Sequence, residues 1–194
     1  MDKQKAKRQH ILEASIQVIA ENGYYKSQVS RIAKAAGVAD GTIYLYFNNK
    51  EDLLISLFEE IMTTFVEEAK RAMEHDNNVK EHLRTLIVHH FQHLGSRPQL
   101  ALLTQLELRQ SQAILRRKIS VILEPYLTLI EGIVSQGIET GEFRKQLDPK
   151  IARQMIFGTM DQVVTSWVMG DMSSSLSEQG EVVYKMLANA LIDS

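Results

Sequence analysis

The chain has 194 residues, of which 44% are hydrophobic and 24% are charged, with three prolines and no cysteine. This composition is typical of a globular chain and excludes a disulfide framework, a thiolate metal site and a cysteine nucleophile. Because the sequence shows neither a signal-peptide pattern nor about 18 successive uncharged apolar residues, we expect a cytoplasmic protein with no membrane partner.

The net charge of −2 is unevenly distributed along the chain. Residues 1–50 contain eight Lys or Arg and four Asp or Glu, a balance of +4, whereas the remainder has 14 basic and 20 acidic residues, a balance of −6. A basic first segment on an acidic remainder indicates a module that binds polyanions. A chance fluctuation of a few charges is the alternative interpretation.

Apolar residues at helical spacing begin near Ile11 and predict a first helix that ends before Gly23. A second helix is predicted over residues 28–35, ending at Gly37, which can adopt the positive φ of a tight turn. A short third helix is predicted over residues 40–46. Two short helices separated by a glycine turn are typical of a helix-turn-helix.

The next predicted helix is long and reaches Met73. Asn48 is the expected N-cap, with Glu51 three residues later completing a capping box. The N–H groups at the start of this helix, together with Lys50, could bind a phosphate that flanks the recognition site.

The third helix carries hydroxyl and aromatic side chains that suit a DNA major groove. Thr42 and Tyr44 can offer hydroxyl groups to phosphates and apolar edges to bases, and Gly41 allows a close backbone approach. The simpler interpretation is that aromatic residues at helical spacing belong to the core. The candidate DNA-contacting residues are Lys26, Gln28, Ser30, Lys34, Ala39, Asp40, Gly41, Thr42, Tyr44, Tyr46 and Lys50.

The segment "GYYKSQVSRIAKAAGVADGTIYLYFNNKEDLL", residues 23–54, resembles the DNA-binding motif of the TetR family of bacterial transcriptional repressors. The resemblance implies an all-α fold, with a helix-turn-helix DNA-binding domain over residues 1–50 and a helical ligand-binding and dimerisation domain over residues 51–194. It also implies a homodimer on a palindromic operator, association with the nucleoid when bound, and no catalytic residues. Ala39 stands where the family often has a capping serine, so Asp40 is expected to serve that helix end.

Helical periodicity continues through the remainder of the chain, which contains no internal repeat. Pro125 is expected to kink one of these helices, and Ser175 with Glu178 suggests a further capping box. The predicted helices are residues 79–94, 98–109, 113–140, 149–169 and a last helix that follows Ser175.

The last two predicted helices have more apolar surface than one neighbour can cover. We expect them to pair with their copies in a four-helix dimer interface. The candidate interface residues are Ile156, Val163, Trp167, Val183, Met186, Leu187, Ala190 and Leu191.

Arg109, Arg116, Arg117 and Lys118 lie close together in an otherwise acidic part of the sequence. They could anchor an anionic ligand whose apolar part enters the core. An acyl chain suits such a site because each buried methylene contributes about 0.8 kcal/mol. Ordinary core packing is the alternative for most of the apolar residues. The candidate ligand residues are Phe65, Phe91, Leu102, Gln105, Leu106, Arg109, Gln110, Tyr126, Ile130, Phe157, Met160 and Asp161.

The segments "TQLELRQS", residues 104–111, and "ARQMIFGTMDQVVTSWVM", residues 152–169, resemble the Bacillus-type fatty-acid-degradation regulators within the TetR family. The resemblance implies release from DNA by long-chain acyl-CoA, control of fatty acid degradation genes and no cofactor. It assigns Arg109 a contact near the phosphate or thioester end of that effector. A different hydrophobic ligand, as in regulators of efflux, is the alternative.

Two other functions are alternatives to a DNA-binding regulator. His89 and His93 are spaced i, i+4, with His82 two turns earlier and His90 beside them, which could hold a metal ion. The helix lacks an HExxH arrangement, so we expect solvated or core histidines and no metal site. A helical adaptor that does not bind DNA is the second alternative, and the basic, hydroxyl-rich first segment argues against it.

Overall fold

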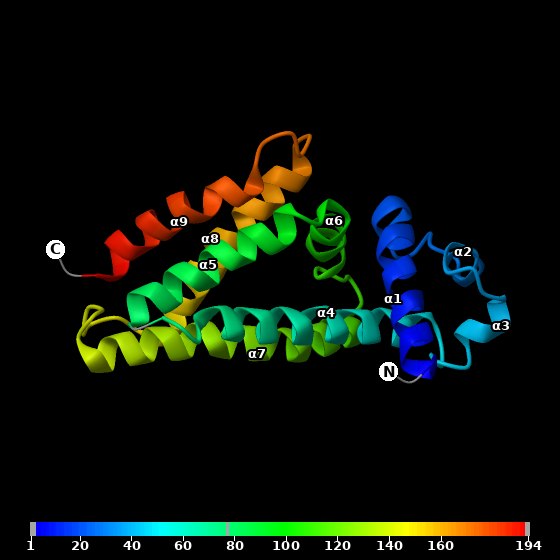
Figure 1. Cartoon of the computed structure of the whole chain (residues 1–194), viewed down its shortest axis with the longest axis horizontal. Helices are drawn as coiled ribbons and strands as arrows, with labels where there is room; N and C mark the ends of the chain where they lie inside the picture. Colours follow the sequence, from blue (N-terminus) through cyan, green and yellow to red (C-terminus); the bar gives the residue numbers. More distant parts are fainter. Residues whose placement is uncertain (1–2, 77, 193–194) are drawn as a thin grey trace. The chain divides into compact units, whose positions relative to one another are not determined.

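The computed structural model describes residues 3–76 and 78–192, and this part of the chain is all-α, as predicted, with no strand (Figure 1). The helices are α1 (Lys3–Asn22), α2 (Val29–Ala35), α3 (Asp40–Ile43), α4 (Lys50–Met73), α5 (Val79–Gly95), α6 (Pro98–Glu107), α7 (Ala113–Thr140), α8 (Pro149–Met169) and α9 (Leu176–Leu191).

The helices form two compact units. The first unit comprises Met1–Met62 and Gln99–Ile122, and the second comprises Thr63–Pro98 and Leu123–Ser194. The helices α1 to α3 therefore share a unit with α6, with the first part of α4 and with the first part of α7.

The helix-turn-helix forms around buried apolar side chains contributed by α1, α2 and the residues that follow them. Ile32 of α2 and Ile43 of α3 are 0% and 1% exposed. At the end of α2, Gly37 has a φ of +61° and the N–H of Val38 donates to the carbonyl of Ala33 at 2.9 Å. This confirms the predicted glycine turn, because the positive φ favours a residue without a Cβ.

The start of α4 is capped one residue later than predicted. The side chain of Asn49, rather than that of Asn48, accepts from the N–H of Asp52 at 2.8 Å. The carboxylate of Asp52 accepts in return from the N–H of Asn48 at 2.8 Å. Asp52 therefore replaces Glu51 as the carboxylate of the capping box. Asn49 supplies the capping oxygen, and Asn48 supplies the N–H that the carboxylate binds.

In the second unit, α9 packs along α5, and α8 packs against both helices (Figure 1). Gly180 of α9 lies against the backbone of α5, where an added Cβ would be 3.1 Å from the Cα of Val88. Asp148 caps α8 by accepting from the N–H groups of Lys150 and Ile151, at 2.9 Å each. Ser175 makes no side-chain capping bond, so the capping box predicted for α9 is wrong.

The helix α7 runs without a break through Pro125. By length and composition alone, this 28-residue helix could cross a membrane. It also buries Leu115 and Ile119 in the first unit and Tyr126 and Ile130 in the second. An inward apolar face of this kind is typical of the core helix of a bundle.

Candidate DNA-binding and effector sites

The candidate DNA-contacting residues lie on and around α2 and α3, and they differ in exposure. Four of them, Ser30, Thr42, Tyr46 and Lys50, are half-buried. The others are exposed: Lys26, Gln28, Lys34, Ala39, Asp40, Gly41 and Tyr44. Hydroxyl, amide and ammonium groups on this surface are the kinds that bind phosphates and base edges.

The recognition helix α3 begins without a side-chain cap. Ala39 occupies the N-cap position in an extended conformation and makes no side-chain hydrogen bond, as the loss of a serine hydroxyl predicts. Its carbonyl instead accepts from the N–H of Thr42 at 2.8 Å. Asp40 places a carboxylate in the first turn, where the helix dipole favours negative charge.

Lys50 is half-buried and folds back onto the turn before α2. Its Nζ donates to the carbonyl of Tyr25 at 3.2 Å and lies 4.5 Å from the ring centroid of Tyr24. Burial lowers the pKa of Lys50, and the carboxylate of Glu107 opposes that shift. The ammonium therefore helps to fix the turn before α2, and the phosphate contact expected of Lys50 remains a prediction.

Glu107, at the end of α6, is a buried carboxylate that sequence reasoning missed, and it is only 7% exposed. Its Oε1 accepts from the N–H of Tyr24 at 2.7 Å. Its Oε2 accepts from the amide of Gln110, whose own Oε1 accepts from the hydroxyl of Tyr25 at 3.0 Å. This network joins α6 to the turn that leads into the helix-turn-helix.

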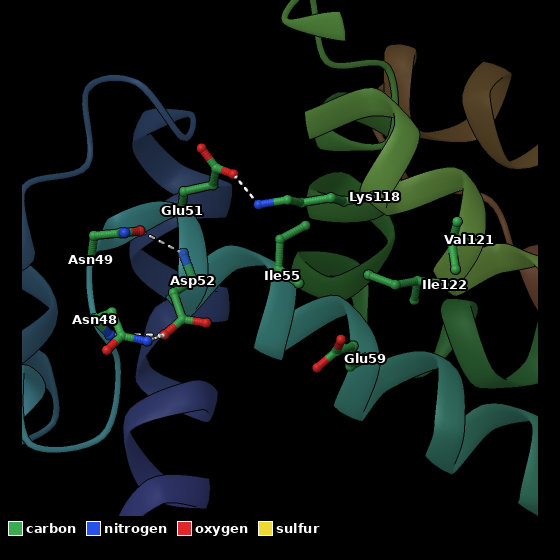
Figure 2. A pocket seen from close by; sticks show the side chains of 9 residues that line it. All are labelled: Asn48, Asn49, Glu51, Asp52, Ile55, Glu59, Lys118, Val121 and Ile122. Atoms are coloured by element: carbon green, nitrogen blue, oxygen red, sulfur yellow. Dashed lines mark hydrogen bonds and ion pairs between the residues drawn. The ribbon is translucent and has the colours of Figure 1, made fainter. Parts of the chain in front are cut away.

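A cleft of about 570 Å³ lies between the first turns of α4 and α7, and Figure 2 shows the side chains that line it. Ile55, Val121 and Ile122 form its apolar part. Across the opening, Nζ of Lys118 lies 2.7 Å from Oε1 of Glu51 (Figure 2). Lys118, predicted as part of a basic ligand anchor, therefore pairs with the start of α4.

Arg109 and Arg116, which were also predicted at the anchor, both donate hydrogen bonds to nearby backbone carbonyls. Nη1 of Arg109 donates to the carbonyl and to the side-chain oxygen of Gln105, at 3.0 and 3.2 Å. Nη1 of Arg116 donates to the carbonyls of Gln110 and Ser111, which closes the connection between α6 and α7. Arg109 is exposed at the end of α6 and presents a guanidinium there. The other candidate ligand residues of this unit are Leu102, half-buried, Gln105 and Gln110, buried, and Leu106, 47% exposed.

The candidate ligand residues of the second unit centre on an aromatic cluster. The ring of Phe65 meets the ring of Tyr126 edge-on at 5.0 Å, and Tyr126 meets Phe157 edge-on at 6.1 Å. Phe157 and Asp161 are half-buried. The fully buried members are Phe65, Phe91, Tyr126, Ile130 and Met160. The ligand contacts expected for these residues remain predictions.

His90 is part of the same cluster. Its Nδ1 lies 3.1 Å from the hydroxyl of Tyr126, and the two rings are stacked at 5.9 Å. Burial, with smaller contributions from His93 and His89, lowers the pKa of His90 to about 3. The imidazole is therefore neutral at pH 7, and its Nδ1 shares a hydrogen bond with the tyrosine hydroxyl.

The residues predicted at the dimer interface fall into two groups. Ile156, Val183, Leu187 and Leu191 are buried in the core of their own subunit, between 0% and 5% exposed, so they are not available to a partner. Val163 and Trp167 are half-buried, whereas Met186 and Ala190 are exposed. The exposed faces of α8 and α9 also carry further large apolar side chains, namely Ile151, Met155, Met169 and Val182.

Two family profiles match the chain. Residues 11–57 match "Bacterial regulatory proteins, tetR family", and residues 58–190 match "YsiA-like protein, C-terminal region". The functional division expected at residue 50 remains a prediction.

Individual relatives match almost from end to end. The fatty acid metabolism regulator protein of Bacillus subtilis is 49% identical over 191 residues, which cover 98% of each chain. The structure of the fatty acid degradation regulator FadR from Bacillus halodurans has a TM-score of 0.92 and 51% identity, and covers 94% of this chain and 98% of that one. The structure of FadR from Bacillus subtilis in complex with stearoyl-CoA has a TM-score of 0.90 and 51% identity, and covers 93% and 97%. These relatives are regulators rather than enzymes, and with the helix-turn-helix and both profile matches they establish that the chain belongs to the tetR family of bacterial regulatory proteins.

Proposed function

We propose that this protein is a homodimeric repressor that binds a palindromic operator, controls fatty acid degradation genes, and leaves DNA when it binds a long-chain acyl-CoA. The observation that carries the proposal is the match of nearly the whole chain to a fatty acid metabolism regulator at 49% identity. The stearoyl-CoA in the related structure supports the class of effector. As a DNA-binding regulator, the protein acts in the cytoplasm.

DNA recognition is assigned to α3 and the exposed residues beside it. Two recognition helices in one dimer would enter successive major grooves, about 34 to 36 Å apart. Lys26 and Lys34 are exposed and suit phosphate contacts, whereas Thr42 and Tyr44 suit contacts in the groove. Lys50 acts indirectly, because its ammonium fixes the turn at Tyr25.

Dimerisation is assigned to the exposed apolar faces of α8 and α9. Met186, Val182 and Met169 are 69%, 52% and 74% exposed, so both helices present large apolar side chains to solvent in the single subunit. A two-fold interface needs a self-complementary surface, and two adjacent helices with apolar outer faces can supply it.

The anionic end of the effector is assigned to Arg109, in the first unit. Arg109 would contact the anionic end of the acyl-CoA through charge-assisted hydrogen bonds. The acyl chain would replace packing among apolar side chains, which is favourable because each buried methylene contributes about 0.8 kcal/mol. Arg109 lies two residues from Glu107, so a change at the end of α6 would reach the Tyr24 turn before the recognition helix.

Direct ligand binding tests this assignment without DNA. By calorimetry, we expect stearoyl-CoA to bind at least about a hundredfold more tightly than butyryl-CoA, because far more methylenes are buried. Arg109→Ala should weaken binding of stearoyl-CoA by about tenfold or more, the loss expected for a charge-assisted hydrogen bond. Lys145→Ala, which removes an exposed charge elsewhere, is the matched control. Equal affinity for stearoyl-CoA and butyryl-CoA would favour a regulator of efflux. Binding of a flavonoid or a quaternary amine as tightly as stearoyl-CoA would favour it as well.

A further inference from the structure

Three residues of metal-binding types lie in the second unit, next to Phe65 of the aromatic cluster. Glu68 projects from α4, and His89 and His93 project from successive turns of α5. Oε2 of Glu68 is 3.1 Å from Nδ1 of His93 and 3.9 Å from Nε2 of His89. All three ligand atoms lie within 4.8 Å of one another.

These separations are close to those of a metal site. Zinc binds imidazole nitrogen and carboxylate oxygen at about 2.0 to 2.2 Å, so tetrahedral ligand atoms lie about 3.4 Å apart. The measured distances fall on both sides of that value. Small rotations of the side chains would therefore bring all three atoms to one ion, without a change in the backbone.

The cluster also contains an unused buried nitrogen. Nε2 of His89 is inaccessible and has no hydrogen-bond partner in the part of the chain that the structure describes. An unpaired buried polar atom is costly, and a metal ion would satisfy it. The ring of Phe65 covers one side of the cluster, at 5.2 Å from His89 and 5.1 Å from His93. Glu68, 34% exposed, leaves the other side open to solvent.

The protonation of the imidazoles is compatible with ligation. Burial lowers the pKa of His89 and of His93, in each case against the nearby carboxylate of Glu68. Both rings are therefore neutral at pH 7, the form that binds metal ions.

Arg97 stabilises the tautomer of His93 that does not bind a metal ion through Nδ1. Its Nη1 lies 3.3 Å from Nε2 of His93. Because a guanidinium only donates, Nε2 of His93 accepts and its Nδ1 carries the proton that faces Glu68. A metal ion on Nδ1 would move that proton to Nε2, where it would meet the N–H of Arg97. Arg97 is exposed, so it can turn away, at a cost in metal affinity.

From this geometry we propose that Glu68, His89 and His93 form a binding site for a divalent transition-metal ion of the Zn²⁺ class, with one position open to water. The ion would join α4 to α5 within the second unit. Two nitrogen ligands and one oxygen ligand suit zinc better than magnesium or calcium, which prefer oxygen alone. The site does not depend on the proposed function.

The test uses full-length protein without an affinity tag, stripped of metal with a chelator. We expect calorimetry to show one Zn²⁺ bound per chain, and Co²⁺ to give the intense visible absorption of a tetrahedral complex. His89→Ala and Glu68→Gln should each weaken Zn²⁺ binding at least tenfold. His10→Ala removes an exposed histidine that is distant in sequence from the cluster, and it should leave the affinity for Zn²⁺ unchanged. Circular dichroism without metal establishes that each variant is folded.

Arg97→Gln provides a second test that carries little risk to folding, since the side chain is exposed. The neutral amide can accept from the N–H of Nε2, so this variant should bind Zn²⁺ several-fold more tightly than the parent. Absence of stoichiometric binding to the parent would overturn the proposal, as would equal affinity in the parent and His89→Ala. Unchanged affinity in Arg97→Gln would overturn ligation through Nδ1 of His93.

Discussion

The carboxylate of Glu107, near the end of α6, accepts a hydrogen bond from the backbone N–H of Tyr24 at 2.7 Å. The two residues are 83 positions apart in the sequence. Tyr24 lies in the turn between α1 and α2, so a residue of α6 fixes the backbone that leads into the helix-turn-helix. A shift of α6 would reach the DNA-binding residues through this bond.

Glu107→Ala should therefore weaken both stability and operator binding. The substitution leaves a buried N–H without a partner, which costs about 1 to 3 kcal/mol of unfolding free energy. Glu107→Gln keeps an acceptor oxygen and should lose less. Urea denaturation and fluorescence anisotropy with operator DNA measure the two effects. Glu21→Ala removes an exposed carboxylate of α1 and serves as the control. If Glu107→Ala binds the operator as tightly as the parent, then Glu107 does not couple α6 to the DNA-binding residues.

The salt dependence of operator binding should separate Lys34 from Lys50. Each phosphate contact contributes about 0.9 to the slope of log K against log salt concentration. Lys34→Ala should reduce the slope by about that amount for each of the two subunits. Lys50→Met should leave the slope near the parental value and lower stability instead, because the ammonium of Lys50 binds the carbonyl of Tyr25. A reduced slope in Lys50→Met would instead support the phosphate contact that the sequence predicts for Lys50.

Stability should fall as the pH falls below about 6.5, the ordinary pKa of histidine. Burial lowers the pKa of His90 to about 3 in the folded state, so the unfolded chain takes up a proton first as the medium becomes acidic. Between pH 7 and pH 5 this linkage removes about 2 kcal/mol of unfolding free energy. His89 and His93, whose pKa values are also lowered, add to the loss in the same direction.

The variant His90→Gln isolates that contribution, because glutamine does not titrate and its amide can still form a hydrogen bond with the hydroxyl of Tyr126. Urea denaturation at pH 7 and pH 5 should show a smaller loss in the variant, by about 2 kcal/mol. An equal loss in parent and variant would contradict a buried, neutral His90.

A charge on the outer face of α9 should disrupt the dimer. Met186 is 69% exposed in the subunit, and Met186→Glu would bury an unpaired carboxylate at the proposed interface. Sedimentation at micromolar concentration should show a dimeric parent and a largely monomeric variant. Lys145→Glu, outside α8 and α9, should remain dimeric. A monomeric parent, or a dimeric Met186→Glu, would show that these faces do not form the interface.

Local signals in the sequence predicted most of the fold. Gly37 ends α2 with the positive φ expected of it, and the helix predicted over residues 149–169 has the bounds of α8. The cap of α4 was displaced by one residue, because two successive asparagines offer the same chemistry and only the backbone decides between them.

Neighbours across the fold could not be predicted in the same way. The apolar stripe of α9 was assigned to a partner subunit, but Val183 and Leu187 pack within their own subunit, since an apolar pattern does not specify what covers it. Glu107 received no prediction, although its position between Leu106 and Leu108 was the one available signal. Its partner at Tyr24 depends on long-range packing.

Release of operator DNA by stearoyl-CoA tests the central claim most directly. The measurement is fluorescence anisotropy of a labelled palindrome from the DNA upstream of the gene, at moderate ionic strength. We predict specific binding of a dimer, and a decrease in operator affinity of about 5- to 150-fold at saturating stearoyl-CoA, the range of a typical allosteric coupling. No preference for the palindrome over bulk DNA, or operator affinity unaffected by stearoyl-CoA, would contradict the account.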